Sequence, residues 1–141
     1  MVAFNKVNSF SEALAEKVHN LGSDVLKVAL VATANTPVNT NTQLSQIVQI
    51  AAGFGYTSGG TQATIASSAQ TSGTYKLVLN DVTFTASGGP IATFQYVVLY
   101  NDTATNKELI GWYDYGTGLS ITNGNSFTVD FDGTNGVLTI V

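Results

Sequence analysis

The chain of 141 residues contains no cysteine and no arginine, and it carries little charge of either sign. Without cysteine it has no disulfide framework, no thiol nucleophile and no thiolate metal site. Its basic residues are all lysines, and they are scattered along the sequence. Because nucleic-acid binding depends on neutralising phosphates and on the arginine fork, we expect no nucleic-acid partner.

Long apolar runs are also missing. No stretch approaches the roughly 18 apolar residues that cross a membrane, so we expect no membrane partner. The first ten residues, MVAFNKVNSF, lack the apolar segment of a signal peptide. We therefore expect the chain to be made in the cytoplasm and to leave a cell only by lysis or inside a particle.

Charged residues make up 10% of the chain, against about 25% in an average soluble domain. The polar remainder is mostly Thr, Asn, Ser and Gly, whose short side chains lose little entropy when they are ordered. Such a surface favours a protein that works against neighbours, so we expect a homo-oligomer or a larger assembly.

Apolar runs alternate with turn-forming clusters through most of the chain, which is typical of a mainly β fold. We expect strands in residues 25–31, 61–67, 74–80, 82–87, 94–100, 109–115, 126–131 and 137–141. Short strands at this spacing predict an antiparallel β-sandwich or a jelly-roll-like barrel with one N-terminal α-helix. The length predicts a single domain, 1–141, with an N-terminal arm (1–8), a helical region (9–22) and a β-rich body (25–141).

The segment Ile91–Tyr115 predicts the central hairpin of this fold. Two runs rich in aromatic and β-branched residues, FQYVVLY and LIGWYDY, flank the turn NDTATNKE. Alternation in the first run predicts one aromatic face (Phe94, Tyr96, Val98, Tyr100) and one mostly aliphatic face (Gln95, Val97, Leu99). Since both faces are apolar, we expect the hairpin to be covered on both sides.

Two further elements are predicted from local signals. Apolar residues at helical spacing predict a helix over Phe10–Leu21, begun by a capping box of Ser9 and Glu12 and ended by Gly22. Its single apolar stripe would pack on a sheet or on a neighbouring subunit. At the other end of the chain, the turn Asp132–Gly136 predicts a hairpin that pairs 126–131 with 137–141.

Between these elements lie two loops and one ambiguous segment. Residues 33–42 are too polar to pack and predict a loop. Leu44–Ala51 fits a short helical turn that passes into a strand near Ile47. The glycine-rich stretch 53–60, GFGYTSGG, lacks the lysine of a phosphate-binding loop, and it indicates a β-turn region anchored by Phe54 and Tyr56.

No group of residues has the spacing of a catalytic or metal site. His19 is the only histidine, and at the end of the predicted helix the helix dipole would favour its cation. Asp130 and Asp132 alternate on a predicted strand, and Asp102 and Asp114 come together if their strands do, which would allow a hard-cation site. We prefer solvated strand edges and a turn-forming Asp132. We expect no enzymatic activity, no catalytic residues, no metal and no cofactor.

The aromatic residues offer one candidate binding surface. Tyr113 and Tyr115 share a face of their predicted strand, opposite Trp112 and Asp114, and this face could stack on a sugar ring. The preferred interpretation is packing in the core or in an interface, where aromatic residues contribute most of the buried area.

Five segments together resemble small structural proteins of tailed bacteriophages. They are FSEALAEKVHNLGSDVLKVAL, AAGFGYTSGG, YKLVLNDVTFTASGGPI, VVLYNDTATNKELIGWYDYG and FTVDFDGTNGVLTIV, and they cover nearly the whole chain. The resemblance implies a place in the virion rather than a reaction. It assigns no functional residue.

Within the virion we expect a decoration or cement protein on the outer surface of the mature head. Its partners would be the major capsid protein and further copies of itself, as a trimer or a dimer. The arm and helix would supply the interface, through Val2, Phe4, Phe10, Leu14 and Val18. The alternatives are a tail, neck or fibre component and, from another class, a glycan-binding adhesion module.

Overall fold

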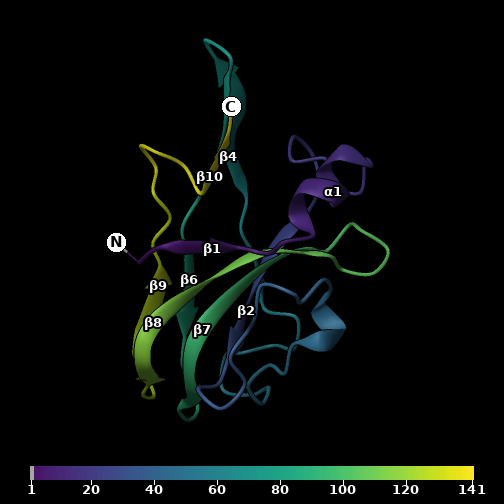
Figure 1. The fold of residues 1–141 in the computed structure, drawn as a ribbon. Helices are drawn as coiled ribbons and strands as arrows, with labels where there is room; N and C mark the ends of the chain where they lie inside the picture. The colour runs from purple at the N-terminus through teal and green to yellow at the C-terminus, as the bar shows by residue number, and fades with distance from the viewer. Residues whose placement is uncertain (1) are drawn as a thin grey trace.

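The computed structural model describes residues 2–141, which form antiparallel β-sheets with one α-helix near the N-terminus (Figure 1). The elements are β1 (Phe4–Lys6), α1 (Phe10–Ala15), β2 (Leu26–Val31), the 3-10 helix η1 (Leu44–Gln46), β3 (Thr61–Gln62), β4 (Ile65–Thr71), β5 (Thr74–Leu79), β6 (Val82–Thr85), β7 (Ile91–Asn101), β8 (Leu109–Ile121), β9 (Ser126–Val129) and β10 (Leu138–Ile140). The predicted mainly β fold with an N-terminal helix is confirmed, and its layers are consistent with a sandwich.

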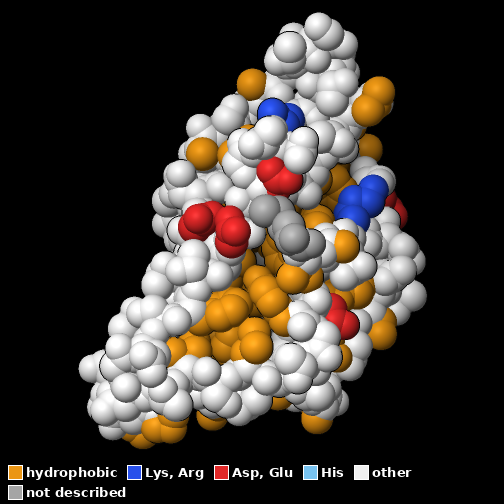
Figure 2. All heavy atoms as spheres, turned by 90° about the vertical axis from the view of Figure 1, so that its left-hand side faces the viewer, with side chains coloured by type: hydrophobic (Ala, Val, Ile, Leu, Met, Phe, Trp, Pro, Cys, Tyr) orange, Lys and Arg blue, Asp and Glu red, His pale blue; other side chains and the backbone are white. Residues whose placement is uncertain are grey.

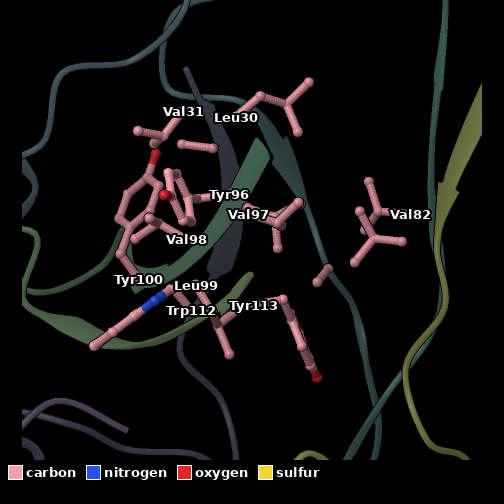
Figure 3. Close-up of a cluster of buried hydrophobic side chains, with 14 of the residues drawn as sticks. Leu30, Val31, Val82, Tyr96, Val97, Val98, Leu99, Tyr100, Trp112 and Tyr113 are labelled. Atoms are coloured by element: carbon pink, nitrogen blue, oxygen red, sulfur yellow. The ribbon is translucent and has the colours of Figure 1, made fainter. Parts of the chain in front are cut away.

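The first layer is a five-stranded sheet in the order β1-β8-β7-β2-β3. The β7–β8 hairpin occupies its centre, and β7 is buried at every position from Phe94 to Asn101. In Figure 3 Tyr96 and Tyr100 project to one side of β7, while Val97 projects to the other side, toward Val82 of β6. The predicted central hairpin, covered on both faces, is confirmed.

One residue of the predicted aromatic face lies on the other side. Phe94 packs edge-on against Phe127 of β9, with ring centroids 5.0 Å apart. The reason is an irregularity in the β7–β8 pairing, because the register shifts between Phe94 and Tyr96. Such an irregularity interrupts the strict alternation of side chains between the two faces of the sheet.

The second layer consists of two short ladders, β6-β9 and β10-β5-β4. Val82 pairs with Val129 in the first ladder, and Leu77 pairs with Leu138 in the second. The predicted hairpin between 126–131 and 137–141 is therefore wrong, since β9 and β10 pair with β6 and β5 instead of with each other. Residues 130–137 connect the two ladders. The β10-β5-β4 ladder projects from the body of the molecule (Figure 1).

The helix is shorter than its apolar spacing predicts, since α1 ends at Ala15 instead of Leu21. Lys17 adopts a left-handed conformation at φ 66°, and the Val18 N–H donates to the Ala13 carbonyl oxygen at 2.8 Å. This Schellman ending replaces the predicted stop at Gly22. The predicted capping box is also wrong, because Ser9 makes no capping hydrogen bond through its side chain.

The loops follow the predictions in part. Residues 33–42 form a loop, and η1 supplies the predicted helical turn, but only Gln49 then makes a β-bridge, to Val31. Of the two predicted anchors in 53–60, Tyr56 is buried, whereas Phe54 is 54% exposed. The strand predicted over residues 109–115 is longer than expected, because β8 continues to Ile121.

Candidate functional site

An apolar hollow opens between the two layers on the side that carries β1, β8 and β9. Figure 2 looks onto this side and shows hydrophobic side chains gathered in the hollow, with acidic groups beside it. We call it the apolar seam and define it by Val2, Phe4, Tyr113, Tyr115 and Phe127. A cavity of about 180 Å³ lies within it, bordered by Val2, Tyr113, Tyr115, Thr128 and Asp130.

Tyr113 forms the floor of the seam. Its ring lies between Phe4, at a centroid distance of 5.1 Å, and Phe131, at 6.0 Å. The residue is only 5% exposed. Burial, together with the neighbouring Tyr115 and the Asp132 and Asp130 carboxylates, raises the pKa of the Tyr113 phenol, so the hydroxyl stays protonated.

Tyr115 and Phe127 form the outer part of the seam. Both are partly buried, and their rings meet edge to face at a centroid distance of 5.3 Å. The predicted shared face of Tyr113 and Tyr115 is therefore present. However, Tyr113 is buried too deeply to offer a flat platform to a sugar, which leaves Tyr115 as the accessible ring of the pair.

The predicted interface residues do not form one surface. Val2 and Phe4 belong to the seam, and Phe4 contacts Tyr113. Leu14 lies on α1, and Val18 lies in the turn that follows α1. Both side chains are partly buried. Phe10, which was predicted to belong to the interface, is 2% exposed and lies in the core of the chain. Its side chain faces inward because α1 lies against the first sheet.

The aspartates act as hydrogen-bond acceptors that shape the turns. Asp130 and Asp132 both lie beyond the end of β9 at Val129, so the two carboxylates do not share a strand face. The Asp132 carboxylate accepts hydrogen bonds from the backbone N–H groups of Thr134 and Asn135, at 2.9 and 2.8 Å. Hydrogen bonds from Asn135 and Thr134 hold the pKa of Asp132 below its usual value. The preferred interpretation, a turn-forming Asp132, is confirmed.

The second predicted pair of aspartates has separate partners. Asp102 forms ion pairs with Lys27 and Lys107, each at 3.0 Å. Burial raises the pKa of Asp102, but hydrogen bonds from the two lysines outweigh that effect and lower it. Asp114 instead accepts hydrogen bonds from the Gln95 side chain at 2.9 Å and the Gly116 backbone at 2.8 Å. The two carboxylates do not form a shared site.

His19 lies beyond the helix end, in a turn that packs against the core. It is 4% exposed, and burial lowers its pKa below the ordinary 6.5. The expected helix-dipole stabilisation of its cation is therefore wrong. Its hydrogen-bonding neighbour is Asn101, which is completely buried. Sequence reasoning missed Asn101, because a single Asn at the end of an apolar run usually indicates a turn.

Among residues 2–141, no three His, Asp or Glu side chains are grouped closely enough to hold a metal ion. Within the same range, α1 is too short to cross a bilayer, as is every other helical segment.

The chain matches no protein-family model, no curated protein and no solved structure.

Proposed function

We propose that this chain is a non-enzymatic structural protein of a tailed-bacteriophage virion, where it decorates the outer surface of the mature head and stabilises it. The observation that carries the proposal is the apolar seam, which leaves aromatic surface open between two layers. In monomeric soluble proteins a concentrated apolar hollow of this kind commonly marks a binding site. The resemblance of five sequence segments to phage structural proteins supplies the proposed setting.

The proposed partner of the seam is a segment of the major capsid protein. Tyr115 and Phe127 would contact an apolar side chain of that segment, since aromatic residues are enriched in the buried centres of interfaces. Asp130 is exposed at the border of the cavity. Its charge favours a capsid segment whose apolar anchor is flanked by lysine or arginine.

The unpaired sheet edges support assembly with further copies. The outer edges of β1 and β3 lie at the margins of the first sheet, and those of β4 and β10 lie at the margins of the projecting ladder. Exposed edges carry backbone groups that can pair with another chain. A closed dimer or trimer at a symmetry axis of the head would cover such edges. Contacts made only with the mature lattice would stabilise that state by mass action.

The proposal is tested by adding the purified chain to phage heads that lack it and measuring the bound fraction by co-sedimentation. We expect Tyr115→Ser to reduce binding at least tenfold, because interface aromatics commonly contribute about 1.4 kcal/mol or more. Phe54→Ser is the matched control, since it removes an exposed aromatic ring from the loop 53–60. Circular dichroism would verify that both variants fold. Equal binding by Tyr115→Ser and the unmodified chain would contradict the proposed role of the seam.

A further inference from the structure

A buried hydrogen-bond network joins two loops on the helical side of the molecule. The first loop comprises residues 16–24, after α1, and the second comprises residues 102–108, between β7 and β8. Asn101 is the last residue of β7 and is completely buried between them. Its side-chain oxygen accepts hydrogen bonds from the backbone N–H groups of Thr103 at 3.0 Å and Ala104 at 3.2 Å.

These contacts fix the orientation of the Asn101 amide. Its Nδ2 donates to the Asp24 carboxylate at 2.7 Å. An exchange of the amide oxygen and nitrogen would place the NH2 group against the N–H groups of Thr103 and Ala104, and the oxygen against the carboxylate. The same Nδ2 lies 3.1 Å from Nδ1 of His19. Because Nδ2 can only donate, Nδ1 of His19 must accept. The imidazole is therefore neutral, with its proton on Nε2.

The remaining surroundings of His19 have opposing effects on its charge. The Phe10 ring stacks on it at a centroid distance of 5.5 Å and an interplanar angle of 24°. The Asp24 and Glu108 carboxylates favour the cation, whereas burial opposes it and dominates. Lys17 and Tyr75 border the same cavity as His19. No hydrogen-bond partner from residues 2–141 reaches Nε2 of His19.

We propose that His19 and Asn101 form an acid-sensitive clasp between loops 16–24 and 102–108. Protonation adds a hydrogen to Nδ1, which then faces the Asn101 amide hydrogen that is not donated to Asp24. The amide has no alternative orientation that keeps its bonds to Thr103, Ala104 and Asp24. The contact between the loops consequently opens, while the β7–β8 hairpin keeps its own pairing. The clasp does not rest on the proposed virion function.

The direction of the pH dependence follows from the lowered pKa of His19. In the open state the ring is solvated and titrates near 6.5. Between 6.5 and the lower pKa of the closed state, the open state binds more protons, so acid favours opening. The clasp is fully formed above pH 6.5, weakens as the pH falls below that value, and loses no further stability below the closed-state pKa.

The first test is an NMR titration of the imidazole. His19 is the only histidine, so its Cε1–H resonance can be followed without ambiguity. We expect a midpoint below 6.5 and, at neutral pH, ¹⁵N shifts of the tautomer with its proton on Nε2. A midpoint at or above 6.5, or a proton on Nδ1, would overturn the clasp. Glu108→Gln removes a carboxylate that favours the cation and should lower the midpoint further.

The second test is amide hydrogen exchange between pH 7.5 and pH 5, corrected for the intrinsic exchange rate. The reporters are the amides of Thr103 and Ala104. As the pH falls from 6.5 to the closed-state pKa, the equilibrium constant for opening should increase by up to about tenfold for each pH unit. In His19→Gln a side-chain oxygen can accept from Asn101 without titrating, so this dependence should disappear. If His19→Gln retained the dependence of the unmodified chain, another group would be responsible and the clasp would be refuted.

Discussion

Replacement of Tyr56 by phenylalanine is a sharp test of how the glycine-rich loop is attached to the sheet. β3 pairs with β2 only at residues 27 and 28, so it does not cover the β2 edge at Leu30. The buried Tyr56 hydroxyl fills that place by accepting the Leu30 N–H at 3.1 Å, and it donates to the Gln49 side-chain oxygen at 2.7 Å. Burial raises the pKa of Tyr56 to about 12, which keeps this donor protonated.

The expected loss of unfolding free energy follows from the polar groups that Tyr56→Phe leaves without a hydrogen-bond partner. The ring can stay in place, but the Leu30 N–H becomes a buried donor without an acceptor, which costs about 1–3 kcal/mol of unfolding free energy. Gln49 loses less, because its oxygen still accepts the Gly59 N–H at 2.8 Å.

The control is Tyr96→Phe, which removes a hydroxyl whose one hydrogen-bond partner among residues 2–141 is Thr36, at 2.9 Å. Thr36 is exposed and can bond water instead, so the expected cost is about 0.5–1 kcal/mol. Urea unfolding of both variants would measure the difference, provided that the slope against denaturant is unchanged. If Tyr56→Phe cost no more than Tyr96→Phe, the proposed attachment would be refuted.

Three further outcomes are expected. Gly111→Ala would place a methyl group against the backbone oxygen of Asn5 and 2.5 Å from the Phe4 ring. It should detach β1, at a cost of about 1–3 kcal/mol, and amide exchange along β1 would detect this. Asp132→Ala should lower the urea midpoint more than Asp130→Ala, which loses no turn hydrogen bond. The lowered pKa of Asp132 gives stability above about pH 3.8 that is lost as the pH falls through the folded-state pKa. Asp132→Asn should reduce that acid sensitivity, as measured by thermal unfolding.

The sequence predicts the elements of this fold better than their partners. The β7–β8 hairpin was predictable because its strands are adjacent in the chain and both are apolar on two faces. The pairing of β9 with β6 and of β10 with β5 was not predictable. It joins segments about 40 to 65 residues apart, and their apolar patterns would allow each strand to pair with several others. The end of the helix was not predictable either, because Lys17 adopts a left-handed conformation that glycine usually supplies.

The candidate site was also predictable from the sequence only in part. The shared face of Tyr113 and Tyr115 follows from strand alternation, so local sequence predicts it. Their contacts with Phe4 and Phe127 depend on which strands meet across the layers, and no local signal specifies that. The burial of Phe10 and His19 also depends on tertiary packing, because helical spacing alone does not show which side of a short helix faces the core.

Immunogold labelling of purified virions, with antibody against this chain, tests the central proposal most directly. The particles should come from the genome that encodes the chain, and the gold should be counted by electron microscopy. We expect the gold to be spread evenly over the heads, as for many copies bound to the capsid lattice. Gold confined to one vertex or to the tail would contradict decoration and favour a neck, tail or fibre component. Virions without label would contradict a place in the particle.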